Sequence, residues 1–225
     1  MYRWDFSPVF ANADLLLQGL LNTFRVTAVA LVFGLVLGLT LALLRLSPRR
    51  LLAWPAGFVI EVFRTTPPLV QLFWFFFALP LLMGVEMSPY LAAVVTFSIQ
   101  SSAFFAEIFR AGIESIERGQ WEAARAIGMN HRQSLSRIVL PQAIARMIPS
   151  FMERSIELMK TTTLVATIAY ADLLYNANAI AQKTYRPLET FTAAAGIYFL
   201  VIFAFSLLAR RVERRLAVSG DSTVH

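Results

Sequence analysis

Four ionisable side chains, Glu153, Arg154, Glu157 and Lys160, lie within an apolar stretch that follows Pro141. A charge at the centre of a membrane helix costs about 2.5–3.5 kcal/mol on insertion scales, so such groups face protein or water rather than lipid. Residues 153, 157, 160, 161 and 164 recur at helical spacing and predict one polar stripe. Within it Glu153 and Glu157 would repel each other, and Lys160 would relieve Glu157. Charges in such a stripe could bind a charged small solute.

Polar residues also interrupt two earlier apolar stretches. One carries Arg64, Thr65, Thr66 and Gln71 around Pro67-Pro68. Prolines remove helix hydrogen bonds and leave carbonyl groups free, which a membrane tolerates only beside protein or a water-filled cavity. The next stretch carries Ser101 and Ser102 at a similar depth. Three stretches are therefore expected to present hydrogen-bonding groups near one plane.

Two interpretations of these groups stay open. In the first they line a path across a membrane, where Arg64 and the threonines receive a carboxylate and Glu153 or Glu157 receives an ammonium group. In the second Arg64, Glu157 and Lys160 form ion pairs that lock helices or a subunit interface, and the prolines only kink a helix. The first interpretation assigns to the path Arg64, Thr65, Thr66, Gln71, Ser101, Ser102, Glu153, Glu157, Lys160 and Thr161. Glu107 and Arg110 are expected to form a structural or gating pair.

The composition places these residues in a membrane protein. The chain has 225 residues, of which 57% are hydrophobic and 15% charged, and its mean hydropathy is +0.61. Soluble domains carry about 25% charged residues. Cysteine is absent, so disulfides and thiolate chemistry are excluded, and two histidines make a histidine-built metal site unexpected. The net charge of +6 lies beside apolar stretches, which favours a membrane topology signal over nucleic-acid binding.

Five apolar stretches are long enough to cross a bilayer, and we place them at 19–44, 54–83, 90–109, 142–168 and 189–209. All must be helical, because lipid cannot satisfy exposed backbone groups. The sequence thus predicts an all-α integral membrane protein with five transmembrane helices. Residues 1–18 are expected to form an extracytoplasmic N-terminal segment, 19–216 a single transmembrane domain, and 217–225 a cytoplasmic tail.

The distribution of arginines predicts the orientation of these spans. Basic clusters follow the first, third and fifth spans: Arg45, Arg49 and Arg50; Arg110, Arg118, Arg125, Arg132 and Arg137; and Arg210, Arg211, Arg214 and Arg215. The positive-inside rule puts these clusters in the cytoplasm. The N-terminus then lies outside and the C-terminus inside.

The loop at 113–140, between the third and fourth spans, is unusually polar and patterned. Arg118–Ala126 are expected to form a short helix, and Gly128 suits the left-handed residue that ends one. Asn130 could cap a second short helix that runs through Ser134 to Val139. Pro141 then suits the first turn of the fourth span.

These residues match a family pattern. Glu122-Ala123-Ala124, Gly128 and Ile138-Val139-Leu140-Pro141 resemble the signature loop of membrane subunits from bacterial ABC importers. The stretches Arg64–Leu72, Glu107–Ile113, Leu140–Ala143 and Glu213–Leu216 are similar to the polar amino acid permease branch of that family, with a type I importer fold. The resemblance implies that the short helix is a coupling helix seated in a groove of an ATP-binding subunit. Its coupling residues would be Gly119, Glu122, Ala123, Ala124 and Gly128.

The resemblance also implies a function and a set of partners. The chain would be the membrane subunit of an ATP-driven importer for a polar amino acid in the bacterial cytoplasmic (inner) membrane. It would act with an ATP-binding subunit, a second permease subunit that is the same chain or a sister, an extracytoplasmic solute-binding protein, and membrane lipid. The sequence lacks a Gly-x-x-x-x-Gly-Lys-[Ser/Thr] phosphate loop, so ATP and Mg are expected on the partner ATPase and no cofactor or enzymatic activity on this chain.

Other functions stay open. The same machine could carry another small zwitterion, such as an opine or an osmolyte. Thr161 stands where close relatives often have an aspartate, which removes a possible ammonium partner. An intramembrane hydrolase or a passive channel is also conceivable, but no histidine lies within any predicted span and a channel leaves the patterned loop unexplained.

Overall fold

The computed structural model describes residues 2–220, with side chains up to Arg211. Every regular element in this range is a helix, as the sequence predicts. Three helices are long and apolar enough to span a membrane alone, namely α2 (Ala13–Arg45), α6 (Pro89–Glu114) and Pro187–Arg211 of α11 (Pro187–Gly220). Two bent pairs of helices bring the number of candidate spans to as many as five. Helix α2 begins before residue 19, the predicted start of the first span.

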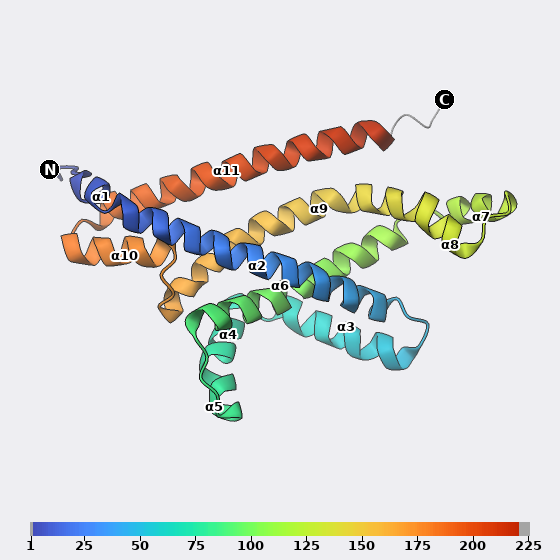
Figure 1. Ribbon diagram of the computed structural model, residues 1–225, viewed down its shortest axis with the longest axis horizontal. Coiled ribbons are helices and arrows are strands. Elements are labelled where there is room, and N and C mark those ends of the chain that lie inside the picture. Colours follow the sequence, from blue (N-terminus) through green and yellow to red (C-terminus); the bar gives the residue numbers. More distant parts are fainter. Residues whose placement is uncertain (1, 221–225) are drawn as a thin grey trace.

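The second predicted span is not one straight helix. It consists of α3 (Arg50–Thr65), α4 (Pro68–Phe73), a π-helical segment (Trp74–Ala78) and α5 (Leu79–Met83). The two parts meet at an angle of 106°, and Figure 1 shows α4 and α5 turning away from α3. Thr66 adopts an extended backbone with ψ 134°, because the residue before a proline is pushed out of the helical region. The predicted second span, 54–83, is therefore present as a pair of helical parts with a sharp bend at Thr66-Pro67.

The fourth predicted span, 142–168, lies within one continuous helical run, and a bend follows it. After α8 (His131–Ser134) and a π-helical segment (Leu135–Val139), α9 (Leu140–Thr161) continues as a 3-10 helix (Thr162–Ile168). Ala169, with φ 58°, ends this run in the left-handed region. A further helix, α10 (Leu173–Thr184), follows at an angle of 47°.

Helices α10 and α1 (Ser7–Ala11) have no counterpart among the predicted spans or the predicted loop helices. The side chain of Asp172 caps α10 by accepting a hydrogen bond from the Tyr175 N–H at 2.8 Å. Asn176 donates to the Leu15 carbonyl at 2.7 Å, and Asn22 of α2 donates to the Ala171 carbonyl at 2.9 Å. These polar bonds tie α10 to the first half of α2.

Helices α2 and α6 form the centre of the structure, and they cross in Figure 1. Their backbones come close because α2 carries glycines at the contact. A Cβ at Gly38 would lie 2.7 Å from the Cβ of Phe105, and one at Gly34 would lie 2.9 Å from the Cβ of Ser101. The glycines therefore permit an approach that larger residues would block.

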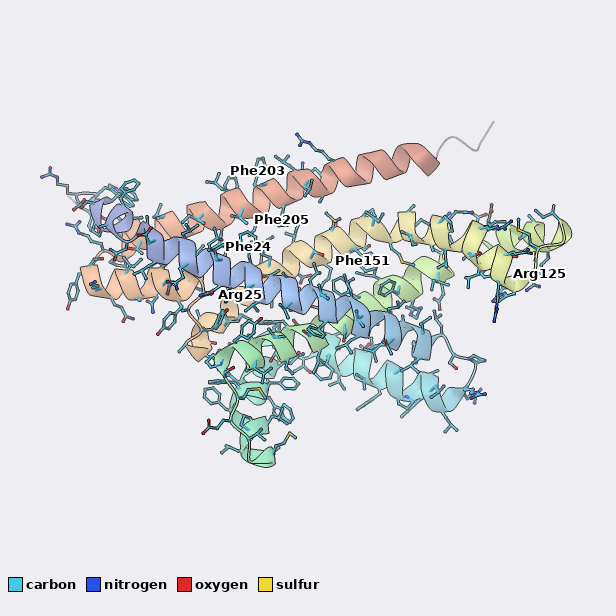
Figure 2. The ribbon with its side chains drawn as sticks, viewed as in Figure 1. Phe24, Arg25, Arg125, Phe151, Phe203 and Phe205 are labelled. Carbon is cyan, nitrogen blue, oxygen red and sulfur yellow. The ribbon has the colours of Figure 1, made fainter. Side chains whose placement is uncertain are left out.

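Helix α11 lies along one side of the bundle (Figure 1), where it packs on α9 and α10. Figure 2 shows Phe205 of this helix near Phe24 of α2, and their ring centroids lie 6.1 Å apart. Much of its remaining apolar surface is exposed, including Phe199, Leu200 and Phe203. Such a surface suits lipid or another membrane helix.

Candidate functional site

A polar cavity of about 480 Å³ lies between α3, α6 and α9. Its walls combine three arginines and three glutamates with smaller and apolar groups. The lining residues are Arg64, Phe104, Glu107, Ile108, Ala111, Gly112, Ser115, Arg146, Met147, Ser150, Glu153, Arg154 and Glu157. Of the ten residues assigned to a path from the sequence, the cavity brings together Arg64, Glu153 and Glu157.

Arg154 is the most deeply buried charge of this cavity. Its side chain is 5% exposed, and its Cζ lies 3.7 Å from the centroid of the Phe104 ring. The Nη1 atom forms an ion pair with Glu157 Oε2 at 2.9 Å, whereas Nε and Nη2 make no hydrogen bond among the described residues. The ion-pair partner of Glu157 among the described side chains is thus Arg154, from the preceding turn, and the relief of Glu157 by Lys160 stays a prediction.

The other acid of the polar stripe has no such partner. Glu153 lines the cavity, and its side chain makes no ion pair or hydrogen bond with the side chains described up to Arg211 or with the described backbone. Lys160 lies outside the cavity lining, and Thr161 uses its hydroxyl to donate to the Glu157 carbonyl at 2.9 Å. The structure therefore leaves one free carboxylate beside one partly coordinated guanidinium.

Arg64 is held loosely at the opposite wall. Its Nη1 lies 3.8 Å from Glu61 Oε2 and 3.9 Å from Glu107 Oε2. Glu107 is instead bound by Arg110, whose Nη2 donates at 2.6 Å and which also pairs with Glu114. The predicted pair of Glu107 and Arg110 is present, and it leaves Arg64 with its hydrogen-bonding capacity largely unused.

The polar residues around Pro67-Pro68 form hydrogen bonds at the interruption between helices α3 and α4. The Gln71 amide nitrogen donates to the carbonyls of Phe63 at 3.0 Å and Thr66 at 2.9 Å, which the break leaves without helical partners. The Thr65 hydroxyl donates to the Glu61 carbonyl at 2.9 Å, and the Thr66 hydroxyl donates to its own helix in the same way. None of these three side chains lines the cavity.

Ser101 and Ser102 lie on the other side of α6. Both are buried, with exposed fractions of 0% and 2%, in the contact with Gly34 and Gly38 of α2. Ser102 donates to the Ile99 carbonyl at 2.7 Å. The helix is thus rotated so that Phe104 and Glu107, rather than these serines, face the cavity. Phe104 was not predicted, and its neighbours in the sequence give no polar signal for it.

The loop between α6 and α9 folds as predicted. Helix α7 spans Arg118–Ala126, Gly128 has φ 80°, and Asn130 forms a capping box with Gln133 at the start of α8. Pro141 lies in the first turn of α9. Figure 1 shows α7 and α8 at the far end of α9, away from the rest of the bundle, and Figure 2 shows Arg125 there.

The surface of this loop carries the expected exposed groups. Glu122, Ala123 and Gly119 are exposed, and a Cβ at Gly119 would meet nothing within 4 Å. Ala124 is different, because it is buried within the chain and supports the loop from inside. The ring of Trp121 stacks on His131 with 5.4 Å between centroids, and a hollow of about 390 Å³ is lined by Arg118, Trp121, Glu122, Arg125 and His131.

Comparison with known proteins identifies the family. Residues 34–218 match the model of the binding-protein-dependent transport system inner membrane component family. This match covers most of the chain. The chain belongs to this family.

Curated relatives resemble the permease over nearly its whole length. It is 37% identical over 224 residues to the glutamate/aspartate import permease protein GltK of Escherichia coli O6:H1 (strain CFT073), covering 96% of this chain and 100% of that protein. It is 35% identical over 212 residues to the arginine transport system permease protein ArtQ of Bacillus subtilis (strain 168), covering 94% of this chain and 97% of ArtQ.

The fold of the permease also matches a solved structure. A chain in the crystal structure of an amino acid ABC transporter with histidines superposes with a TM-score of 0.90 at 36% identity. The match covers 95% of this chain and 100% of that chain. The sequence-based assignment to the amino acid permeases of ABC importers is therefore confirmed.

Proposed function

We propose that this permease is the membrane-spanning subunit of an ATP-driven importer that carries a polar amino acid across the bacterial inner membrane. The observation that carries the proposal is the cavity between α3, α6 and α9 in a chain of this transport family. Its wall presents the free carboxylate of Glu153 and the partly coordinated guanidinium of Arg154. A zwitterion needs one group of each sign, so the cavity is suited to an amino acid.

The remaining residues assigned to the path take supporting places in this proposal. Thr65, Thr66 and Gln71 stabilise the break between α3 and α4, and Ser101 and Ser102 set the close packing of α6 on α2. Lys160 and Thr161 follow the cavity along α9 and would meet the solute before or after it occupies the cavity.

The arrangement of basic residues supports a cytoplasmic position for the loop and the C-terminus. Figure 1 shows that the α2–α3 connection, α7 and α8, and the end of α11 gather at one end of the molecule. These segments contain the three basic clusters, whereas α1 and α10 lie at the opposite end. By the positive-inside rule the first end faces the cytoplasm and the N-terminus faces outward.

In this orientation α7 is the coupling helix. Glu122 and Ala123 face outward beside a hollow that could receive a side chain of an ATP-binding subunit, while Gly119 leaves room for close approach. Gly128 ends the helix in a conformation that other residues adopt at a cost. ATP and Mg would bind to that partner subunit, and movement of the partner would reach the permease through α7.

The complete importer would contain further components. A second permease, either another copy or a sister chain, would close the cavity, which is open in the single chain. A solute-binding protein would deliver the amino acid outside, and lipid would cover the exposed apolar surface of α11. Rocking of the two permeases would then expose the cavity alternately to the two sides.

The substitution Glu122→Ala tests the coupling role in proteoliposomes that contain the complete importer. We expect uptake of a labelled amino acid to fall by about tenfold, the loss of one charge-assisted contact, while the protein still inserts and the ATPase still turns over. The matched control is Glu117→Ala, which removes the same charge from an exposed residue that directly precedes α7. Normal uptake by Glu122→Ala would overturn the coupling assignment, and no uptake of any amino acid by the wild type would overturn the proposed function.

A further inference from the structure

Arg154 is an unusual group for the wall of a membrane cavity. Its side chain is 5% exposed, yet only one of its three nitrogen atoms has a partner in the described structure. A guanidinium carries five N–H donors, and donors left unmatched in a buried place cost free energy. Either the unmatched donors only reduce the stability of the protein, or they bind a hydrogen-bond acceptor from a ligand.

The surroundings of Arg154 fit the second possibility. The Phe104 ring supports the face of the guanidinium at 3.7 Å and holds its plane. The unpartnered Nε and Nη2 are closed off from solvent, so an acceptor reaches them only when a side chain of the cavity wall moves. Planar guanidinium groups bind carboxylates through two parallel bonds. The one acceptor present, Glu157, is 62% exposed and contacts Nη1 alone, so its flexible side chain can move aside.

We infer that Arg154, supported by Phe104, is the carboxylate-binding residue of the cavity and a determinant of which amino acid this permease accepts. The inference rests on the proposed function and changes the role of Arg64, which receives the carboxylate in the first of the two sequence-based interpretations. Arg64 lies farther from the same ring, at 5.8 Å, and is 36% exposed. It is therefore more exposed and less closely stacked on Phe104 than Arg154.

The carboxylate could come from two parts of an amino acid. Every amino acid has an α-carboxylate, and acidic amino acids have a second one on the side chain. Binding of radiolabelled L-glutamate, L-glutamine and L-arginine to the purified importer separates these sources. The measurement is made by scintillation proximity without the solute-binding protein, so that selectivity reports the permease itself.

The test compares the wild type with Arg154→Gln, Arg154→Lys and the control Arg50→Gln, which removes a charge from an exposed residue at the start of α3. If Arg154 reads a side-chain carboxylate, Arg154→Gln weakens L-glutamate binding by roughly 10- to 100-fold and leaves L-glutamine unchanged. If it reads the α-carboxylate, binding of whichever amino acids the wild type binds weakens alike. In both cases Arg154→Lys restores part of the loss, and Arg50→Gln matches the wild type.

Two results would overturn the inference. One is wild-type binding by a monodisperse Arg154→Gln protein, and the other is a uniform loss that Arg154→Lys does not restore. Uptake is measured in parallel in proteoliposomes with the ATPase and the binding protein. If the importer transports an amino acid and Arg154→Gln binds it as the wild type does, the inference on Arg154 is wrong and the proposed function stands. If the importer transports no amino acid, the proposed function is wrong.

Discussion

The side chains of Arg154 and Glu157 form an ion pair at 2.9 Å that joins a buried cation to an exposed anion. The Arg154 side chain is 5% exposed and the Glu157 side chain 62% exposed, so only the carboxylate is in contact with solvent. Removing the Glu157 carboxylate leaves the Arg154 guanidinium without any acceptor among the described residues. This asymmetry gives the pair a role in stability that can be measured separately from transport.

We expect Glu157→Gln to lower the free energy of unfolding by about 1–2 kcal/mol. Glutamine keeps an oxygen that can accept from Arg154 Nη1 but removes the negative charge that balances the buried guanidinium, and water at the Glu157 end limits the loss. The measurement is thermal unfolding in detergent, followed by fluorescence. Glu153→Gln is the matched control, because Glu153 has no partner among the described residues and its loss should leave the melting temperature unchanged. Equal melting temperatures for both variants would contradict the prediction.

The contact between α2 and α6 predicts that Gly38→Ala destabilises the permease by about 1–3 kcal/mol, the usual effect of overpacking a filled contact. The new Cβ would lie 2.7 Å from the Cβ of Phe105 and 2.9 Å from the Ser102 carbonyl oxygen, and backbone cannot move aside locally. Gly196→Ala on α11 is the control, since a Cβ there meets nothing within 4 Å. Thermal unfolding of both proteins tests this prediction. If Gly38→Ala is as stable as Gly196→Ala, α2 and α6 can move apart to fit the new methyl group without loss of stability, and the prediction is wrong.

The break before α4 predicts that Gln71→Leu lowers stability by about 1–3 kcal/mol. Leucine fills a similar space but leaves the carbonyls of Phe63 and Thr66 without the bonds that Gln71 donates. The control is Gln182→Leu, at an exposed residue of α10. Limited proteolysis near the Thr66–Pro67 junction reports the effect directly. Cleavage at the wild-type rate would mean that other groups satisfy these carbonyls.

Much of this architecture could be predicted because the signals were local. A capping box at Asn130, a left-handed Gly128 and Pro141 in a first helical turn depend on neighbouring residues, and the structure has all three. Long apolar runs gave α2, α6 and α11 for the same reason. The loop helix Arg118–Ala126 matches its predicted bounds.

The remainder depends on contacts between distant residues. The 106° bend at Thr66 needs Gln71 to satisfy freed carbonyls, and the proline pair alone does not distinguish a kink from a break. Asn176 ties α10 to Leu15, and Asn22 ties the connection before α10 to α2 at Ala171. These contacts join residues far apart in the sequence, so no apolar run predicted the helix. The cavity depends on the rotation of α6, which buries Ser101 and exposes Phe104.

Helix α9 starts beside α8 and carries Glu153 and Arg154 fourteen or so residues later, about 20 Å along its axis at 1.5 Å per residue. Between these two ends lies Pro149, which removes one helical hydrogen bond. In the proposed importer, movement of α7 would therefore reach Glu153 and Arg154 along a helix that can bend at Pro149.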